Sequence, residues 1–487
     1  MNPVLRSVIR ISGIMLLVLG LAMILTCIVS AISGEWRQGL PFLWIGLLVF
    51  LTGFLSRTLC KGWHQKLHIG DGFLIVTILW IFMSFVGALP YMITGVLPGF
   101  ASAYFESCSG FTTTGATVLT QINHLPHGIL FWRSMTCWLG GVGILLIAIT
   151  LMPALGLNGQ RLNTPDNYGP VLEEMSPRMI DSIRTIILIY TGMTLLETVL
   201  LRVCGLTLFN SLIHSMSTVS TGGFCRYDDS IAHFDGIGVP LIISVFMIFS
   251  GLNYHLMLHR PKNGLRTFLA SSEIHLYGIL LGSSFLLISA ALLKHSHGAN
   301  PGRAMTDALF QSASFLSTTG FASDDYCHWT QFPQMILLFL MFCGACTASP
   351  SGGIKVARVS ILLKLVRHGI STRLHTNFIE TVRMNGQGMG ADAVSGVATM
   401  PFLYLMALFA GTFALTFSGV TLSAAFNASI ACLCNTGHAF GTLGLGGTFA
   451  SFGGIFKCIL SLLMIGGRLE LYAIVILLTP RYWTRDH

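Results

Sequence analysis

The sequence predicts an all-α integral membrane protein with two leading helices and four pseudo-symmetric helix, re-entrant pore loop and helix repeats around a central pore. Three observations support this fold class. The 487 residues are 53% hydrophobic and 9% charged, with a mean hydropathy of +0.74, whereas soluble domains carry about 25% charged residues. Apolar stretches of bilayer length, roughly 20 residues, recur along the chain. A polar Thr-Gly run also recurs four times among them.

Ten apolar segments are predicted as membrane spans. They cover residues 10–31, 41–56, 72–96, 128–152, 183–203, 236–258, 274–293, 332–363, 397–417 and 452–479. The first segment follows Arg6 and Arg10, but it is long and lacks a small-residue cleavage site, so we expect a retained helix rather than a signal peptide. The net charge of +8 arises in short loops between spans, which favours the positive-inside rule over nucleic acid binding.

The order of parts along the chain repeats four times. Each repeat has an apolar span, a segment too short to cross a bilayer, a Thr-Gly run and a further apolar span. We therefore predict two N-terminal transmembrane helices in residues 1–66, followed by repeats in residues 67–156, 157–262, 263–372 and 373–487. Internal repeats in membrane proteins often surround a shared pathway.

The short segments read "ASAYFESCSGF", "TLFNSLIHSMSTV", "AMTDALFQSASFL" and "LSAAFNASIACLC". Each provides about three helical turns, which reach about halfway through a bilayer at roughly 1.5 Å per residue. We expect these segments to enter the membrane as short helices and to return as extended chain.

The Thr-Gly runs are candidates for a cation filter. Non-helical backbone at membrane depth is tolerated only where it is buried in protein or lines water. Glycine permits positive φ, and four such loops can form rings of oxygen atoms that replace the water shell of a cation. Alignment on the glycines predicts the ring residues Thr113, Thr114, Gly115, Ser220, Thr221, Gly222, Thr318, Thr319, Gly320, Asn435, Thr436 and Gly437. Ordinary turns that cap the next helix are the alternative, which explains one copy but not the symmetric placement.

Several acidic residues have two interpretations. Asp228, Asp229, Asp324 and Asp325 follow the second and third loops, where they either concentrate cations at a pore mouth or belong to solvated loops. Glu106 lies at membrane depth in the first short segment. An ionisable group at that depth is a functional candidate, and it is equally suited to brace the first loop by hydrogen bonds.

A gate is predicted below the loops. The stretch "FCGACTASPSGGIKVARV" interrupts a span with Pro350 and the glycines Gly344, Gly352 and Gly353, so residues 344–353 are expected to unwind and cross the pore. The last span carries Arg468 in "IGGRLELY", and a buried arginine at this depth costs at least ~2.5 kcal/mol. Arg468 either provides a positive barrier in the pathway or forms a salt bridge with Glu470 or another acid.

The four loops, the break before "GIKV", and "GGRLE" followed by "LLTPRYW" resemble the TrkH/TrkG potassium-uptake proteins of the Trk/Ktr/HKT superfamily. The resemblance covers residues 1–485 and includes "FWRSMTCWLGGVGILLIAITLMP". It implies a channel-like K+-translocating subunit of the bacterial inner membrane, with K+ as the transported ion and no organic cofactor. It further implies a homodimer in the lipid bilayer and a cytoplasmic TrkA-type partner whose RCK domains bind nucleotide.

The resemblance also assigns roles to residues of this chain. Thr114, Thr221, Thr319 and Thr436 and the glycines after them match filter positions, residues 344–353 match an intramembrane gating loop, and Arg468 matches the pore arginine. One departure concerns the fourth loop, which in this family usually contains Gly-Pro-Gly and here reads "NTGHAFG". His438 stands at the position of the proline, which weakens the expectation of strict K+ over Na+ selectivity.

The expected function is K+ uptake through a four-loop pore, driven by the electrochemical gradient. An ion-coupled secondary transporter is the alternative, but it predicts inverted repeats and paired intramembrane acids, whereas these repeats run in parallel order. An enzyme is not expected, because no metal-ligand spacing of His and Glu and no Ser/Lys pair recurs within the spans.

Overall fold

The computed structural model describes residues 3–59, 69–151, 177–258, 271–295, 300–374, 383–384 and 387–480. These residues are helical apart from their connecting loops and one small antiparallel pair, β1 (Arg383–Met384) with β2 (Gln387–Gly388). In this part of the chain, seven helices are long and apolar enough to cross a membrane, or eight if one bent pair counts as a single span. The predicted all-α membrane fold is confirmed.

The first two helices, α1 (Pro3–Ile32) and α2 (Trp36–Leu59), form a closely packed hairpin. Glycines make this close approach possible, because a Cβ built on Gly20 would lie 2.7 Å from the Gly46 carbonyl oxygen and one on Gly53 would lie 2.8 Å from that of Gly13. Small residues at helix contacts are a common means of packing inside membranes. The hairpin then packs through α1 against α3 and α5.

Each of the four repeats contains a short helix between longer ones. Repeat 1 has α3 (Ile69–Ile93), α4 (Phe100–Phe111) and α5 (His127–Leu151), and repeat 2 has α6 (Pro177–Val203), α7 (Leu208–Val219), α8 (Gly238–Ser250) and α9 (Tyr254–Leu258). Repeat 3 has α11 (Ser272–His295), α12 (Pro301–Leu316), α13 (Gln331–Cys343) and α14 (Val356–Leu374). Repeat 4 has α15 (Ala391–Thr416), α16 (Leu422–Leu433), α17 (Gly454–Arg468) and α18 (Tyr472–Leu478).

The short helices α4, α7, α12 and α16 begin and end close to the predicted short segments. Three of them start at a side-chain cap, in which Thr207, Asn300 or Thr421 accepts a backbone amide of the first turn. The predicted boundaries at residues 66/67, 156/157 and 262/263 lie outside the described residues, and the boundary at 372/373 falls within the last turn of α14.

Three of the ten predicted spans are not single helices. The span at 236–258 breaks at residues 251–253 between α8 and α9, and the span at 332–363 breaks between α13 and α14. The span at 452–479 bends by 112° between α17 and α18. The bend lies at Glu470 and Leu471, both of which have positive φ, so hydropathy alone does not reveal it.

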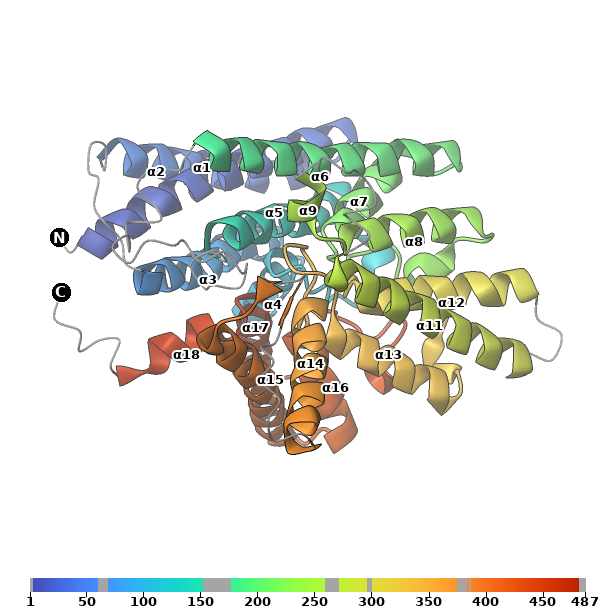
Figure 1. Ribbon diagram of the computed structural model, residues 1–487. Coiled ribbons are helices and arrows are strands. Elements are labelled where there is room, and N and C mark those ends of the chain that lie inside the picture. The colour runs from blue at the N-terminus through green and yellow to red at the C-terminus, as the bar shows by residue number, and fades with distance from the viewer. Residues whose placement is uncertain are drawn as a thin grey trace.

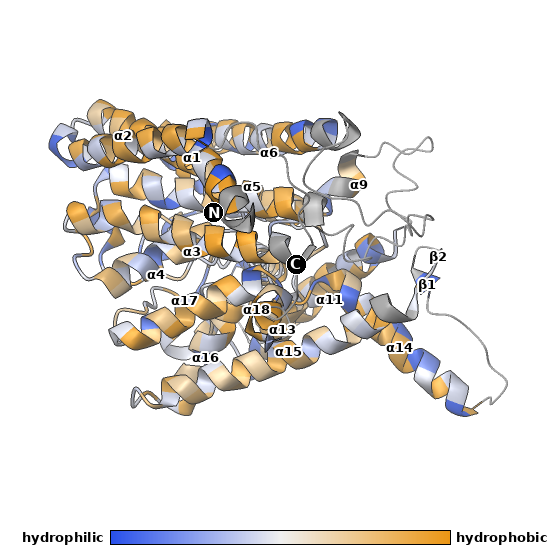
Figure 2. Cartoon of the chain, turned by 90° about the vertical axis from the view of Figure 1, so that its left-hand side faces the viewer, coloured by the Kyte–Doolittle hydropathy of each residue, from blue (hydrophilic) through white to orange (hydrophobic). Residues whose placement is uncertain are grey.

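The short helices converge at their C-terminal ends, where the loops that follow them contact one another. Figure 1 shows α4 and α17 near the centre, with α1, α2 and α6 on one side and α14, α15 and α16 on the other. Figure 2 shows that apolar residues cover most helices, whereas the far end of α14 projects from the bundle and is hydrophilic. That part of α14 carries Lys364, Arg367 and Arg373, so α14 is not an apolar membrane span.

Candidate functional site

The four short helices end with the same backbone motif. After α4, the amides of Thr113 and Thr114 donate to the carbonyl oxygens of Gly110 and Ser109, both at 2.8 Å, which is the Schellman pattern. The equivalent residues of all four repeats have left-handed backbone: Thr113 (φ 50°), Thr221 (φ 53°), Thr318 (φ 56°) and Asn435 (φ 53°). Such residues cost on the order of 1–3 kcal/mol each. Their recurrence indicates that the surrounding structure enforces this turn.

A glycine with positive φ follows each left-handed residue by two positions. These glycines are Gly115 (φ 82°), Gly223 (φ 67°), Gly320 (φ 79°) and Gly437 (φ 76°). Gly223 therefore occupies the position that the sequence alignment assigned to Gly222, and the second loop is shifted by one residue. The Schellman hydrogen bonds show the same shift, because the Gly222 amide donates to the Ser217 carbonyl oxygen as the Thr114 amide donates to that of Ser109.

The loops form a closed ring in chain order. A Cβ built on each of these glycines would lie within 2.5 Å of a carbonyl oxygen of the next loop. The Cβ on Gly115 would meet the carbonyl oxygen of Gly222, and that on Gly223 the carbonyl oxygen of Thr319. The Cβ on Gly320 would meet the carbonyl oxygen of Thr436, and that on Gly437 the carbonyl oxygen of Thr114. Each contact involves the residue directly before the neighbouring glycine, so the four loops are related by fourfold pseudo-symmetry. Only glycine fits at these four contacts.

The predicted ring residues are all buried. The structure brings together Thr113, Thr114 and Gly115 with Thr318, Thr319 and Gly320, and with Asn435, Thr436 and Gly437. In the second loop the matching residues are Thr221, Gly222 and Gly223, whereas Ser220 matches Thr112, Ser317 and Cys434 one position earlier. Gly223 is thus a residue that sequence reasoning missed, although "STGGF" presents both glycines.

The ring offers neutral oxygen atoms. The hydroxyls of Thr113, Thr221 and Thr436 are buried and have no hydrogen-bond partner in the described chain. All four short helices end at the ring, and a helix C-terminus carries a partial negative charge of about half an elementary charge. In the described residues, no three His, Cys, Asp or Glu side chains gather to hold a metal ion. This chemistry suits a weakly held, dehydrated monovalent cation.

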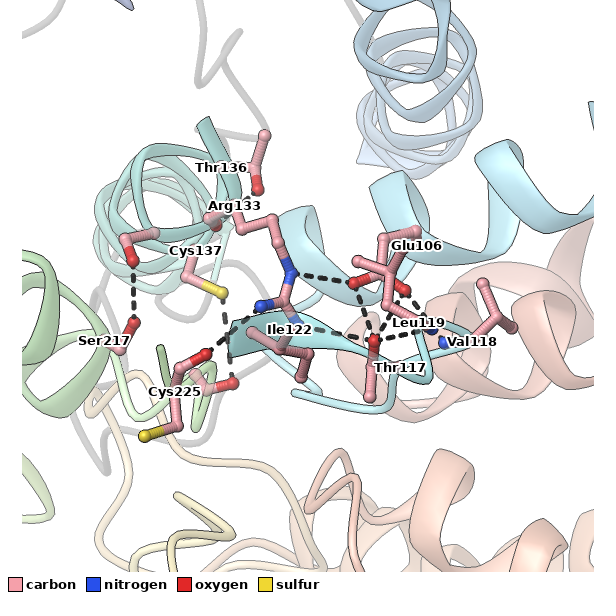
Figure 3. Close-up of polar contacts among 12 residues, drawn as sticks. Glu106, Thr117, Val118, Leu119, Ile122, Arg133, Thr136, Cys137, Ser217 and Cys225 are labelled. Atoms are coloured by element: carbon pink, nitrogen blue, oxygen red, sulfur yellow. Dashed lines mark hydrogen bonds and ion pairs between the residues drawn. The ribbon is translucent and has the colours of Figure 1, made fainter. Parts of the chain in front are cut away.

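Glu106 joins the first two loops through a buried ion pair (Figure 3). Its carboxylate accepts from Arg133 Nε at 2.9 Å, from the Thr117 hydroxyl at 3.0 Å and from the Val118 amide at 2.9 Å. Arg133 Nη1 in turn donates to the Cys225 carbonyl oxygen, 3.2 Å away in the second loop. The bracing role of Glu106 is confirmed. Arg133 was not singled out by sequence, although it is a lone basic residue within an apolar span.

The other short helices also brace the chain that returns from their loops. Asp307 accepts from the Ser323 hydroxyl at 2.8 Å, and Asn427 accepts from the Phe440 amide at 3.4 Å. Asn210 donates to the Tyr227 hydroxyl at 3.1 Å. In each repeat, therefore, a polar residue of the short helix forms a hydrogen bond with the chain that follows the Thr-Gly loop. The helix end precedes the loop and this bond follows it, so the loop is held at both of its ends.

Replacing Glu106 with glutamine is expected to destabilise the protein by about 3–5 kcal/mol, because Arg133 is left buried without an anionic partner. Thermal and denaturant unfolding of the purified protein measure this loss. Glu35→Gln is the matched control, since Glu35 pairs with His127 at a partly exposed site and is expected to contribute about 1 kcal/mol or less. Equal losses in the two variants contradict a structural role for the buried pair.

The predicted gating segment is a loop between α13 and α14. Its two ends touch, because a Cβ built on Gly353 would lie 2.9 Å from the Gly344 Cα, and both glycines have positive φ. The Gly352 amide donates to the Thr318 hydroxyl at 2.7 Å, which ties the loop to the left-handed residue of the third ring segment. The unwound loop thus lies directly against the ring.

Two buried basic residues hold this loop. Arg468 Nη1 donates to the Pro350 carbonyl oxygen. The Lys355 ammonium donates to the carbonyl oxygens of Ser349 (3.3 Å) and Ser351, and to the Ser351 hydroxyl (3.0 Å). Sequence analysis did not assign Lys355 to the gate. It is nevertheless buried beside Arg468, and both line a cavity of about 70 Å³ together with residues of the loop.

The alternative salt bridge between Arg468 and Glu470 does not form. Glu470 pairs instead with Arg358 of α14. The Nε and Nη2 atoms of Arg468 are buried and have no hydrogen-bond partner in the described chain, so this guanidinium is not neutralised by an acid. A positive charge therefore faces the cavity next to the ring.

The acidic residues after the loops differ in position. Asp228 accepts from the Ile122 amide at 2.8 Å and lines a second cavity at the ring, together with His438 and the ring glycines Gly115 and Gly223. Asp324 accepts from Trp329 Nε1 at 2.8 Å, and neither it nor Asp229 lines that cavity. Asp228 is therefore the acid that fits a pore mouth, and Asp229 and Asp324 fit the interpretation of solvated loop residues.

Sequence and structure comparisons agree with this architecture. A family model described as "TrkH: Cation transport protein" matches residues 41–484. The Trk system potassium uptake protein TrkH of Vibrio parahaemolyticus is 31% identical over 98% of this chain and 99% of its own, and TrkG of Escherichia coli K12 is 30% identical over 98% of both chains. The crystal structure of the potassium transporter TrkH from Vibrio parahaemolyticus superposes with a TM-score of 0.89 and 30% identity, covering 98% of this chain and 99% of that one.

The apolar helical spans and the family match define a multi-pass transport protein of the membrane rather than an enzyme. The chain belongs to the TrkH family of cation transport proteins. The resemblance found in the sequence is therefore confirmed, and the bacterial inner membrane is the location that this family membership supports.

Proposed function

We propose that this chain is the K+-translocating subunit of a Trk-type potassium uptake system. Its relatives of 30–31% identity are named potassium uptake proteins, and the alignments span nearly the full length of both chains. The observation that carries the proposal is the closed ring of four loops, in which each glycine packs against a carbonyl of the next loop.

The ring serves as the selectivity filter. Its ligands to the transported ion are backbone carbonyls of the residues at positions 113–115, 221–223, 318–320 and 435–437, with the free hydroxyls of Thr113 and Thr221 at the strained turns. Neutral oxygens bind K+ weakly enough to release it, which conduction requires. The interlocked glycines fix the spacing of the ring, and this rigidity favours one ion size.

The loop at 344–353 and Arg468 form the gate below the filter. The loop contacts the filter through Gly352 and Thr318, and Arg468 holds Pro350 in place. An uncompensated guanidinium in the pathway raises the energy of a cation beside it. Opening then requires the loop to move and Arg468 to withdraw or be screened.

The assembly consists of a homodimer in the lipid bilayer with one pore per protomer, regulated by a cytoplasmic TrkA-type subunit whose RCK domains bind nucleotide. The names of the relatives place them in a Trk system, which implies additional components. The hydrophilic end of α14, which follows the gating loop along the chain, projects from the bundle (Figure 2). A regulatory partner that binds this end could therefore act on the gate.

An ion-coupled symporter with less strict K+ selectivity is the second candidate. It is favoured by one observation, His438, which lines the cavity at the ring where the family's usual sequence has proline. A histidine leaves the backbone of the fourth loop less constrained than proline would. A dependence of Rb+ uptake on a Na+ or H+ gradient, at constant membrane potential, distinguishes the symporter from a channel.

Expression in bacterial cells that lack all potassium importers tests the proposed function. Expression of the chain with its Trk partner is expected to restore growth at low K+. The same cells are expected to take up Rb+. A protein that is confirmed in the membrane but gives neither growth nor Rb+ uptake contradicts the proposal.

A further inference from the structure

Glu197 is a fully buried acid on α6, with 0% of its surface exposed. Neither carboxylate oxygen has a hydrogen-bond partner in the described chain. The other buried acids differ in this respect. Glu106 pairs with Arg133, Asp307 pairs with Arg303, and Glu273 accepts from Asn253 and Thr347. Glu197 alone among the buried acids that the structure describes lacks a donor.

Among the side chains that the structure describes, the helices packed against α6 give this carboxyl group no cationic partner. On α7 the Thr218 hydroxyl faces it but donates to the His214 carbonyl oxygen at 2.8 Å. The His214 ring lies among Tyr227, Phe234 and Phe321. Among the described side chains of α9, Tyr254 is titratable and couples to Glu197, and its hydroxyl contacts Met193. Helix α8 has no titratable residue. On α5, Trp138 Nε1 donates to the Thr194 hydroxyl of α6, and the Trp138 carbonyl oxygen accepts from the Tyr190 hydroxyl of α6.

The basic residue nearest along α6 is Arg202, which donates to the Leu206 carbonyl oxygen at 3.1 Å. An ionised carboxylate at Glu197 would therefore have no counter-ion among the described side chains, and its polar neighbour, the Thr218 hydroxyl, already donates to the His214 carbonyl oxygen. Such a charge costs several kcal/mol or more to bury, and a group in this position takes up a proton instead. The neutral acid is the form that this site accommodates.

Glu197 also lies behind the second filter loop. The carbonyl oxygen of Thr218 accepts the amide of the strained residue Thr221 at 2.9 Å, and that of the adjacent Ser217 accepts the Gly222 amide at 2.8 Å. These two bonds hold the turn that sets the register of the loop. A negative charge beside Thr218 acts on the last turn of α7, where these carbonyls are located.

We propose that Glu197 is a proton-binding site that keeps the second filter loop in its conducting shape. The neutral carboxylic acid packs against α7. When its O–H bond breaks, the proton passes to water and the carboxylate remains, so its charge draws in water and loosens the turn at Thr221. This regulatory role depends on the proposed function of the filter, whereas the proton-binding site itself does not.

Infrared spectroscopy of the purified full-length protein during a step to alkaline pH tests the proton directly. Wild type is expected to lose a carboxylic acid C=O band that Glu197→Gln lacks from the start. The Glu35→Gln control keeps this band, because Glu35 is partly exposed and paired with His127. A band of equal size in wild type and Glu197→Gln overturns the proposal.

Rb+ uptake into liposomes tests the regulation. Wild-type uptake is expected to fall at alkaline pH, since the protonated fraction drops about tenfold for each pH unit above the titration midpoint. Glu197→Gln and the apolar variant Glu197→Met are expected to fold and to lose this fall, because no hydrogen bond to Glu197 is lost. If Rb+ uptake by both variants falls at alkaline pH as it does in wild type, the regulatory role is overturned. Absence of Rb+ uptake in every protein, with the infrared band present, refutes the proposed transport function but not the proton site.

Discussion

Replacing Gly223 with alanine is expected to lower the discrimination between K+ and Na+ by about tenfold or more, which corresponds to about 1.4 kcal/mol. Gly223 has a φ of 67°, and a Cβ built on it would lie 2.0 Å from the Thr319 carbonyl oxygen of the third loop. A methyl group at this position must displace the backbone of the neighbouring filter segment. Reversal potentials in mixed K+ and Na+ solutions measure the change, and Gly320→Ala is expected to behave in the same way through Thr436.

Gly222→Ala is the matched control, because Gly222 lacks positive φ and a Cβ there would meet the Cys137 side chain at 2.7 Å. Glycine at position 137 removes both the Cβ and the Sγ that would meet the added methyl group, so the double variant Gly222→Ala with Cys137→Gly is expected to recover selectivity. The same Cys137→Gly change is not expected to rescue Gly223→Ala. Equal selectivity of Gly223→Ala and wild type contradicts the ring register given by the structure.

Replacing Arg468 with alanine is expected to raise K+ flux severalfold and to weaken regulation. The change removes the donor that holds Pro350 of the gating loop and the unpaired positive charge that lines the cavity. A barrier lowered by about 1.4 kcal/mol raises the rate about tenfold. Rb+ flux into liposomes, with and without the Trk partner, measures both effects.

Two further substitutions separate charge from structure at Arg468. Arg468→Lys keeps the charge but not the planar donor set, and we expect it to retain most of the barrier. Arg468→Met keeps the approximate length without charge, and we expect it to resemble alanine. If Arg468→Ala leaves the flux unchanged, the arginine has a structural role and is not part of the gate.

Local sequence patterns predicted the short helices and the loops well. The lengths of the short segments and the clustered glycines around Pro350 act over a few residues, and each was visible in the sequence, whereas the cap at Thr421 was not singled out. The bend between α17 and α18 was not visible, because non-glycine residues at Glu470 and Leu471 adopt positive φ there. The ion pair between Arg358 and Glu470 supports that bend. Because the two residues lie 112 positions apart in sequence, local patterns do not reveal this pair.

The register of the second loop was missed for a similar reason. "STGGF" offers two adjacent glycines, and nothing within the loop distinguishes them. The distinction comes from the neighbouring loop, whose Thr319 carbonyl leaves no room for a side chain at Gly223. The partners of Glu106 and Lys355 likewise depend on packing between distant segments. Contacts of this kind require the assembled fold.

The central claim is that the four-loop ring selects K+, and Rb+ uptake into liposomes containing the purified chain together with its Trk partner tests it most directly. We expect uptake driven by a negative interior potential, with K+ competing strongly and Na+ competing weakly. Uptake no greater than that of protein-free liposomes, or equal competition by Na+ and K+, would contradict the claim.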